Sequence, residues 1–297
     1  MNTKQQQEAL EYFQKSAQEW AEKGKGNFKD EVNVIKERND FVLHVISQRE
    51  KTDIALDVGC GTGDLACEIA LRGVNAIGVD FAQDMIDIAQ EKARAKNIEK
   101  ATFETRSIFD CHYEHGTFDV ISANGFIEYI SYQQFYEFLH FCWQALKPGG
   151  SLVLGSRNRL FNIFSLNTFT QTEIEQGVIL ALLNEAIYIV KNPNVLLLKG
   201  FVAAPLQEEG SIHGHTGIEV STRYQFTPAQ LVKIIGENGF EPIELSPINI
   251  HGLSPAFAKD HQAAHVSVSN FLQNFTDDGT RLIPQSSSFM IHCKKIS

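Results

Sequence analysis

Residues 54–66 read I-A-L-D-V-G-C-G-T-G-D-L-A, and this stretch decides the fold. An apolar run over residues 54–58 leads into three glycines at alternate positions, Gly59, Gly61 and Gly63, and helix-forming residues follow. Glycine reaches positive φ without strain and lets a ligand approach the backbone closely. The first N–H groups of the helix that follows have no partner inside it. The stretch therefore predicts a buried strand, a tight turn and a helix start that can hold a ligand.

The spacing of the glycines indicates which ligand this is. A dinucleotide-binding loop has the pattern G-x-G-x-x-G, whereas here the third glycine comes only two residues after the second. Asp57 stands two residues before the first glycine, and a second apolar segment, residues 76–79, ends in Asp80 and Phe81. An acid about 20 residues after the loop offers two acceptors to a ribose diol, and the ring offers an apolar face to a purine. The loop fits a nucleoside without a pyrophosphate better than it fits NAD.

Three further motifs follow the glycine loop. They are V-D-F-A-Q-D-M-I-D-I-A at residues 79–89, F-D-V-I-S-A-N-G-F-I-E-Y-I at residues 118–130 and L-K-P-G-G-S-L-V-L-G at residues 146–155. Together the four resemble the class I S-adenosylmethionine-dependent methyltransferases, in the small-molecule branch with a UbiE/UbiG-like core. This resemblance implies S-adenosyl-L-methionine (SAM) as cofactor and S-adenosyl-L-homocysteine (SAH) as product. It also implies a doubly wound, Rossmann-like α/β fold whose seven-stranded sheet has an antiparallel last strand.

The cofactor site that this resemblance implies lies at the carboxyl ends of the first four strands. Relatives often place an Asp against the adenine after the third strand, where this sequence has Ser107, so the adenine contact falls to Ser107, to a backbone carbonyl or to Asp110. Some relatives hold the methionyl carboxylate with an arginine just before the first strand, as Arg38 would, although a solvated surface arginine is the alternative. The expected cofactor-binding residues are Asp57, Gly59, Cys60, Gly61, Gly63, Asp80, Phe81, Ser107, Ile108, Asn124 and Arg38.

The chain is expected to form one core with additions at both ends of the fold. Residues 1–50 are predicted to form N-terminal helices that act as a cofactor lid, and residues 51–158 the SAM-binding core. Residues 159–222 form a mostly helical cap insertion over the substrate site, because long loops are usually functional and their aromatic content suits a small-molecule pocket. A dimer surface or an extension of the core is the alternative. Residues 223–297 complete the core and contain a second, smaller insertion. The candidate lid residues are Tyr12, Phe13 and Trp20.

Methyl transfer to a weakly acidic hydroxyl needs a base, and the sequence contains four candidates. They are His213 and His215 in the first insertion, His251 before the second, and Glu128 after the fourth strand. The predicted function is O-methylation of a hydroxyl on an apolar or aromatic small molecule. An N-methyltransferase, a protein methyltransferase and a protein that binds SAM without catalysis are the alternatives.

Composition limits the partners. A net charge of -10 argues against a nucleic-acid substrate, because such binding depends on clustered Lys and Arg. Five cysteines without C-x-x-C spacing favour reduced thiols, and no metal site is expected. The N-terminus is polar, and the longest apolar run, residues 178–190, is broken and too short to span a bilayer. We therefore expect a cytoplasmic protein with a small-molecule acceptor and no stable membrane insertion, and the sequence leaves a homodimer open.

Overall fold

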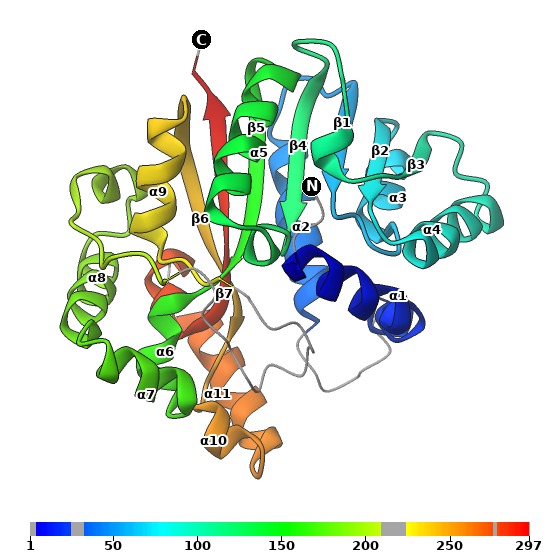
Figure 1. The fold of residues 1–297 in the computed structure, drawn as a ribbon. Helices are drawn as coiled ribbons and strands as arrows, with labels where there is room; N and C mark the ends of the chain where they lie inside the picture. Colours follow the sequence, from blue (N-terminus) through cyan, green and yellow to red (C-terminus); the bar gives the residue numbers. More distant parts are fainter. Residues whose placement is uncertain (1–3, 25–32, 209–223, 276–277, 297) are drawn as a thin grey trace.

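The computed structural model describes residues 4–24, 33–208, 224–275 and 278–296 (Figure 1). Its centre is one seven-stranded sheet in the order β3-β2-β1-β4-β5-β7-β6, in which β7 runs antiparallel to both of its neighbours. The predicted doubly wound fold with an antiparallel last strand is confirmed. The strands are β1 Ile54–Val58, β2 Asn75–Asp80, β3 Ala101–Thr105, β4 Phe118–Asn124, β5 Leu146–Arg157, β6 Phe240–Ile250 and β7 Ser286–Lys295.

Helices cover both faces of the sheet. One face packs on α5 and α9, and the other packs on α2 and α3 (Figure 1). In β1, Leu56 belongs to the first apolar layer and Ala55 to the second, as the two-residue period of a strand requires. The helices of the core are α2 Val34–Ser47, α3 Asp64–Leu71, α4 Gln83–Ala95, α5 Tyr132–Ala145 and α9 Pro228–Glu237.

The last strand differs from its prediction. Its sequence predicts inward Phe289, Ile291 and Cys293 alternating with polar, outward neighbours. In the structure Met290 and His292 are buried as well, because α2 covers the second face of the sheet at this strand. A strand at an interior position of a sheet with two covered faces buries both sets of side chains.

The first insertion also differs in its helices. The sequence of residues 172–191 predicts one helical stretch, but α7 Thr168–Glu175 and α8 Ile179–Lys191 are separate, and Gly177 between them has a φ of +69°. A buried ion pair within this insertion holds α7 against the 3-10 helix η3 Arg159–Phe161, with Nη2 of Arg159 2.7 Å from Oε2 of Glu173. The remaining elements here are α6 Asn162–Ser165 and the 3-10 helix η4 Val195–Gly200.

Two further helical segments lie near the carboxyl ends of the parallel strands. The long helix α1 Lys4–Gly24 packs on α4 through an apolar cluster that includes Leu10, Phe13 and Met85. The second insertion contains α10 Pro255–Ala258, α11 Gln262–Phe275 and η5 Gly279–Gln285, and Figure 1 shows α10 and α11 below the sheet. Over the described ranges of the chain, no helix is both long enough and apolar enough to cross a membrane.

Candidate functional site

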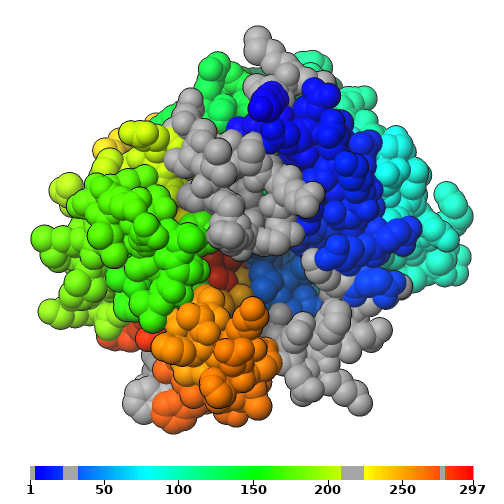
Figure 2. All heavy atoms as spheres, turned by 60° about the horizontal axis from the view of Figure 1, so that its bottom comes forward, coloured from blue at the N-terminus to red at the C-terminus, as the bar shows by residue number. Residues whose placement is uncertain are grey.

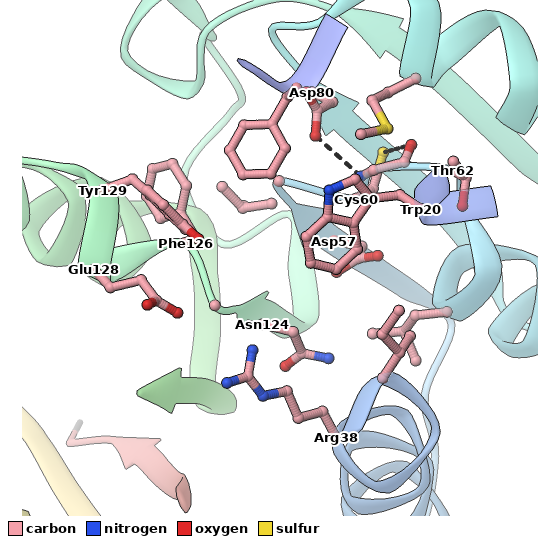
Figure 3. A pocket seen from close by; sticks show the side chains of 18 of the residues that line it. Trp20, Arg38, Asp57, Cys60, Thr62, Asp80, Asn124, Phe126, Glu128 and Tyr129 are labelled. Carbon is pink, nitrogen blue, oxygen red and sulfur yellow. Dashed lines mark hydrogen bonds between the residues drawn. The ribbon is translucent and has the colours of Figure 1, made fainter. Parts of the chain in front are cut away.

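A cavity of about 510 Å³ opens at the carboxyl ends of the parallel strands (Figure 3). This volume is within the range of small-molecule sites. In Figure 2, which brings this edge of the sheet forward, the surface is hollowed between α2 in blue and α10 and α11 in orange. The predicted site residues that line the cavity are Arg38, Asp57, Gly59, Cys60, Gly61, Asp80, Phe81, Ser107, Ile108, Asn124 and Glu128.

The glycines of the loop have different tasks. All three have positive φ, with +66° at Gly59, +51° at Gly61 and +74° at Gly63. A Cβ added to Gly61 would meet no atom within 4 Å, so this residue faces open cavity. A Cβ on Gly63 would lie 2.6 Å from a ring carbon of Phe103 and 2.7 Å from Cβ of Ala89. Gly61 therefore leaves room for a ligand, whereas Gly63 allows close packing and does not line the cavity.

Asp80 fixes the loop against the end of β2. Its Oδ2 accepts a hydrogen bond from the N–H of Gly61 at 3.0 Å, and its Oδ1 accepts one from the N–H of Ala82 at 2.9 Å. Burial raises the pKa of this carboxyl, and the backbone hydrogen bonds partly offset the increase. Each carboxylate oxygen has a second acceptor position, so Asp80 can hold the loop and still accept from a ligand hydroxyl.

Asp57 is a second buried carboxyl on the same wall of the cavity. The hydroxyl of Ser122 donates to its Oδ1 at 2.9 Å. Burial is the largest influence on this group and raises its pKa to about 7, although the bond from Ser122 acts in the opposite direction. A cation beside such a carboxyl stabilises the ionised form, so Asp57 is suited to a positively charged ligand.

The wall near β3 ends in a short 3-10 helix, η1 Ile108–Asp110. Ser107 caps this helix, and its hydroxyl oxygen accepts a hydrogen bond from the N–H of Phe109 at 3.4 Å. Ser107 and Ile108 line the cavity together with Phe81, whereas Asp110 is exposed and does not. These residues give the end of the cavity an apolar surface with one small polar group.

The opposite wall carries the side chains of Arg38, Asn124 and Glu128 (Figure 3). Arg38 lies on α2, and its Nη2 donates to the hydroxyl of Ser288 on β7 at 2.9 Å. Glu128 lies on η2 Ile127–Tyr129 and is buried, with its Oε2 2.8 Å from Nε of Arg157. This ion pair directs one oxygen of the Glu128 carboxylate toward Arg157.

Of the three predicted histidine bases, only His251 belongs to the described residues, and it does not line the cavity. His213 and His215 lie outside the described residues. The ring of His251 packs against Phe161, with centroids 4.5 Å apart, and against His265 at 5.1 Å. Burial lowers the pKa of His251 to about 4, so its imidazole is neutral at pH 7.

The described part of the first insertion packs on the core rather than along the cavity. Residues 159–208 contain none of the cavity-lining side chains. Glu185 on α8 instead accepts from the N–H of Ala229 at the start of α9, on the side of the sheet away from α2. A cap over the site stays a prediction, and it would have to involve residues 209–222, which lie outside the described part.

The N-terminal helix α1 covers the cavity directly. Phe13 and Trp20, two of the candidate lid residues, line it, whereas Tyr12 does not. The ring of Phe13 meets that of Tyr129 edge to face, with centroids 5.3 Å apart, which connects α1 to the wall after β4.

Among the lining residues that reasoning from the sequence missed, Arg157, Asn249, Ser287 and Ser288 belong to β5, β6 and β7. Arg157 ends β5, and Ser287 and Ser288 begin β7. Because β7 is antiparallel, its first residues lie at the same edge as the ends of the parallel strands. The predicted antiparallel direction of the last strand therefore indicates that its first residues lie near the site.

Known proteins match the core of this chain. Residues 55–150 match the family model of a methyltransferase domain. A demethylmenaquinone methyltransferase from Deinococcus radiodurans is 39% identical over 102 residues, which cover 33% of this chain and 41% of that protein. A ubiquinone biosynthesis O-methyltransferase from Hydrogenovibrio crunogenus is 27% identical over 156 residues, which cover 52% of this chain and 62% of that protein. The chain thus matches less than two thirds of the length of either relative.

Solved structures share the fold over a longer range. The magnesium protoporphyrin IX methyltransferase from Synechocystis PCC 6803, crystallised with bound SAH, has a TM-score of 0.56 at 15% identity and covers 97% of both chains. A methyltransferase from Methanosarcina mazei has a TM-score of 0.55 at 18% identity and covers 86% of this chain. At these identities the likeness concerns the fold alone.

Substitutions at Gly61 and Gly63 should change the stability of the protein by different amounts. Gly63→Ala should lower the free energy of unfolding by about 2–4 kcal/mol, because the strain of positive φ adds to a clash with Phe103 and Ala89. Gly61→Ala should cost only the strain, about 1–2 kcal/mol, because its Cβ enters open space. Urea denaturation followed by circular dichroism measures both. Equal losses would show that the packing at Gly63 does not matter.

Proposed function

Because this chain belongs, through residues 55–150, to the class I S-adenosylmethionine-dependent methyltransferases, we propose that it transfers a methyl group from SAM to a hydroxyl of a small apolar or aromatic molecule. The relatives named above as demethylmenaquinone methyltransferase and ubiquinone biosynthesis O-methyltransferase support an acceptor of this class. The observation that carries the proposal is the pairing of Gly61, open to the cavity, with the buried Asp80 carboxylate that its N–H contacts.

The chemistry of the cavity walls fits the parts of SAM. Asp80 would accept from the ribose hydroxyls, and Phe81 and Ile108 would contact the adenine beside the hydroxyl of Ser107. Asp57 would lie toward the positive charges of the methionyl part, and Arg38 would bind its carboxylate. Asp57 would thus face the positive charges of SAM and Arg38 its carboxylate, so each charge of the ligand would have a partner.

When SAM is bound, its sulfonium supplies an activated methyl group, so the acceptor oxygen bonds to the methyl carbon while the carbon–sulfur bond breaks and its electron pair stays on sulfur. The protein has to align the acceptor and exclude water. Phe13 and Trp20 of α1 would keep water out, since they line the cavity and Phe13 packs on Tyr129. These contacts support the role of the N-terminal helix as a lid.

Two of the four candidate bases, Glu128 and His251, belong to the described part of the chain. Glu128 lies in the cavity but pairs with Arg157. His251 is packed between Phe161 and His265 and does not line the cavity. His213 and His215 stay candidates from the sequence. An acceptor that enters as an anion would need none of them, because its proton has already left.

A labelled-methyl assay tests the activity. Purified protein and methyl-labelled SAM are added to fractionated lysate, and label should enter the small-molecule fraction. Gly61→Val should abolish both this transfer and SAH binding measured by calorimetry, because its side chain would fill the space beside the loop. Gly177→Val is the matched control, since Gly177 also has positive φ and open space but is exposed between α7 and α8. A folded Gly61→Val protein with unchanged SAH affinity would remove the loop from the site.

The pKa of Asp57 predicts how SAM affinity depends on pH. Below pH 7 the free protein carries a proton on this carboxyl, and binding a cation must expel it. SAM affinity should therefore fall about twofold from pH 8 to pH 7 and about tenfold from pH 8 to pH 6, since about half of the sites are ionised at the pKa and about one in ten is ionised one pH unit below it.

The Asp57→Asn variant provides the control for this pH dependence. It should bind SAM more weakly at pH 8 than the wild-type protein, and its affinity should change little between pH 6 and pH 8. Calorimetry at the three pH values measures this. Equal wild-type affinities at pH 6 and pH 8 would mean that Asp57 does not sense the charge of the ligand.

A further inference from the structure

The cavity extends well beyond the part that the cofactor proposal uses. Asp80 ends β2 and Arg157 ends β5, and the sheet order places three strand spacings between them. Neighbouring strands lie about 4.8 Å apart, so these two positions are separated by about 14 Å across the sheet. Arg157 therefore lies in a second compartment, bordered by β5 and β7 rather than by β1 and β2.

Arg157 is oriented by a contact of its Nε, which leaves the terminal nitrogens of the guanidinium available for a ligand. Its Nε pairs with the buried Glu128, whose side chain is 4% exposed, while the side chain of Arg157 itself is 28% exposed and lines the cavity. Within the described residues, its two terminal nitrogens have no hydrogen-bond partner. A guanidinium has five donors in a plane, so one edge can bind Glu128 while the end binds another group.

The surroundings of Arg157 form a prepared polar wall. Asn249 lines the same compartment and has a φ of +55°, a conformation that costs free energy in a residue other than glycine. The carboxylate of Glu37 stabilises it by accepting from its N–H at 2.7 Å, and its Nδ2 donates to the hydroxyl of Ser287 at 2.8 Å. The side chains next to Arg157 are thus fixed before any ligand binds.

Charge separates the two compartments. Asp57 and Asp80 face the first compartment, where the exposed Arg106 is the cation of the lining. Arg38 lies between the two compartments, and the second compartment contains Arg157 and its partner Glu128. If Arg38 binds the methionyl carboxylate, Arg157 is the cation that is left to bind an acceptor. Its two parallel N–H bonds match a planar oxyanion.

We propose that the terminal nitrogens of Arg157 bind an anionic oxygen group of the methyl acceptor, either a carboxylate or a phenolate. This inference rests on the proposed function, because it takes the first compartment as the SAM site. Arg157 is then an acceptor-binding residue, and Glu128 is its positioning partner rather than a base.

Calorimetry on the SAH-saturated protein tests the proposal with three simple probes: benzoate, 4-nitrophenolate and benzyl alcohol. At least one of the anions should bind about ten- to a hundredfold more tightly than the neutral alcohol, as expected for charge-assisted hydrogen bonds. The anion that gains more distinguishes a carboxylate from a phenolate. Equal binding of all three probes would overturn the proposal.

The variants are chosen so that the fold survives. Arg157→Gln alone would leave Glu128 buried without its cation, so the informative protein is the double variant Arg157→Gln with Glu128→Gln, which removes both charges and keeps the volume. It should lose the preference for the anion and keep its affinity for SAH. Arg157→Lys preserves the pair with Glu128 but lacks the planar fork, and should lose about tenfold in affinity for the anion.

The outcomes distinguish the role of Arg157 from the proposed binding of SAM. Failure of the wild-type protein to bind SAH would refute the SAM site, and the role of Arg157 with it. Normal SAH binding combined with an undiminished anion preference in the double variant would refute Arg157 alone.

Discussion

The hydrogen bond from the N–H of Gly61 to the buried carboxylate of Asp80 is the contact on which the site depends. It joins the loop after β1 to the end of β2, and it requires a backbone at positive φ that brings no side chain into the cavity. The same carboxylate receives the N–H of Ala82 at the start of α4, so one buried acid fixes two elements. Replacing that acid would therefore disturb the shape of the loop as well as a ligand contact.

The order of the strands gives the cavity its two ends. Strands β1 and β2 present acids, whereas β5, β6 and β7 present Arg157, Asn249 and two serines. Between them, Arg38 on α2 reaches Ser288 on β7, which links the helix before the core to the last strand of the chain. Segments from both ends of the sequence thus complete a site whose centre is the glycine loop. Such a division suits a protein that has to bind a cationic donor beside a separate acceptor.

Local sequence signals predicted the first compartment well. The glycine loop and the acid that ends β2 are each recognised from residues close together in the sequence, and the structure contains both. The second compartment depends on contacts such as that between Arg157 and Glu128, which come from different strand ends. The residues next to Glu128 in the sequence do not indicate its contact with Arg157, so the sequence alone suggests a base at this position. The break between α7 and α8 at Gly177 was hidden by an apolar pattern that continues across it.

A crystal structure with SAH tests the central claim most directly, because it shows which compartment holds the nucleoside. The ribose hydroxyls should lie within hydrogen-bond distance of Asp80, with the adenine against Phe81 and Ile108 and the sulfur toward the compartment of Arg157. SAH bound outside the cavity, or with its adenine against Arg157 and Asn249, would contradict the assignment of the two compartments.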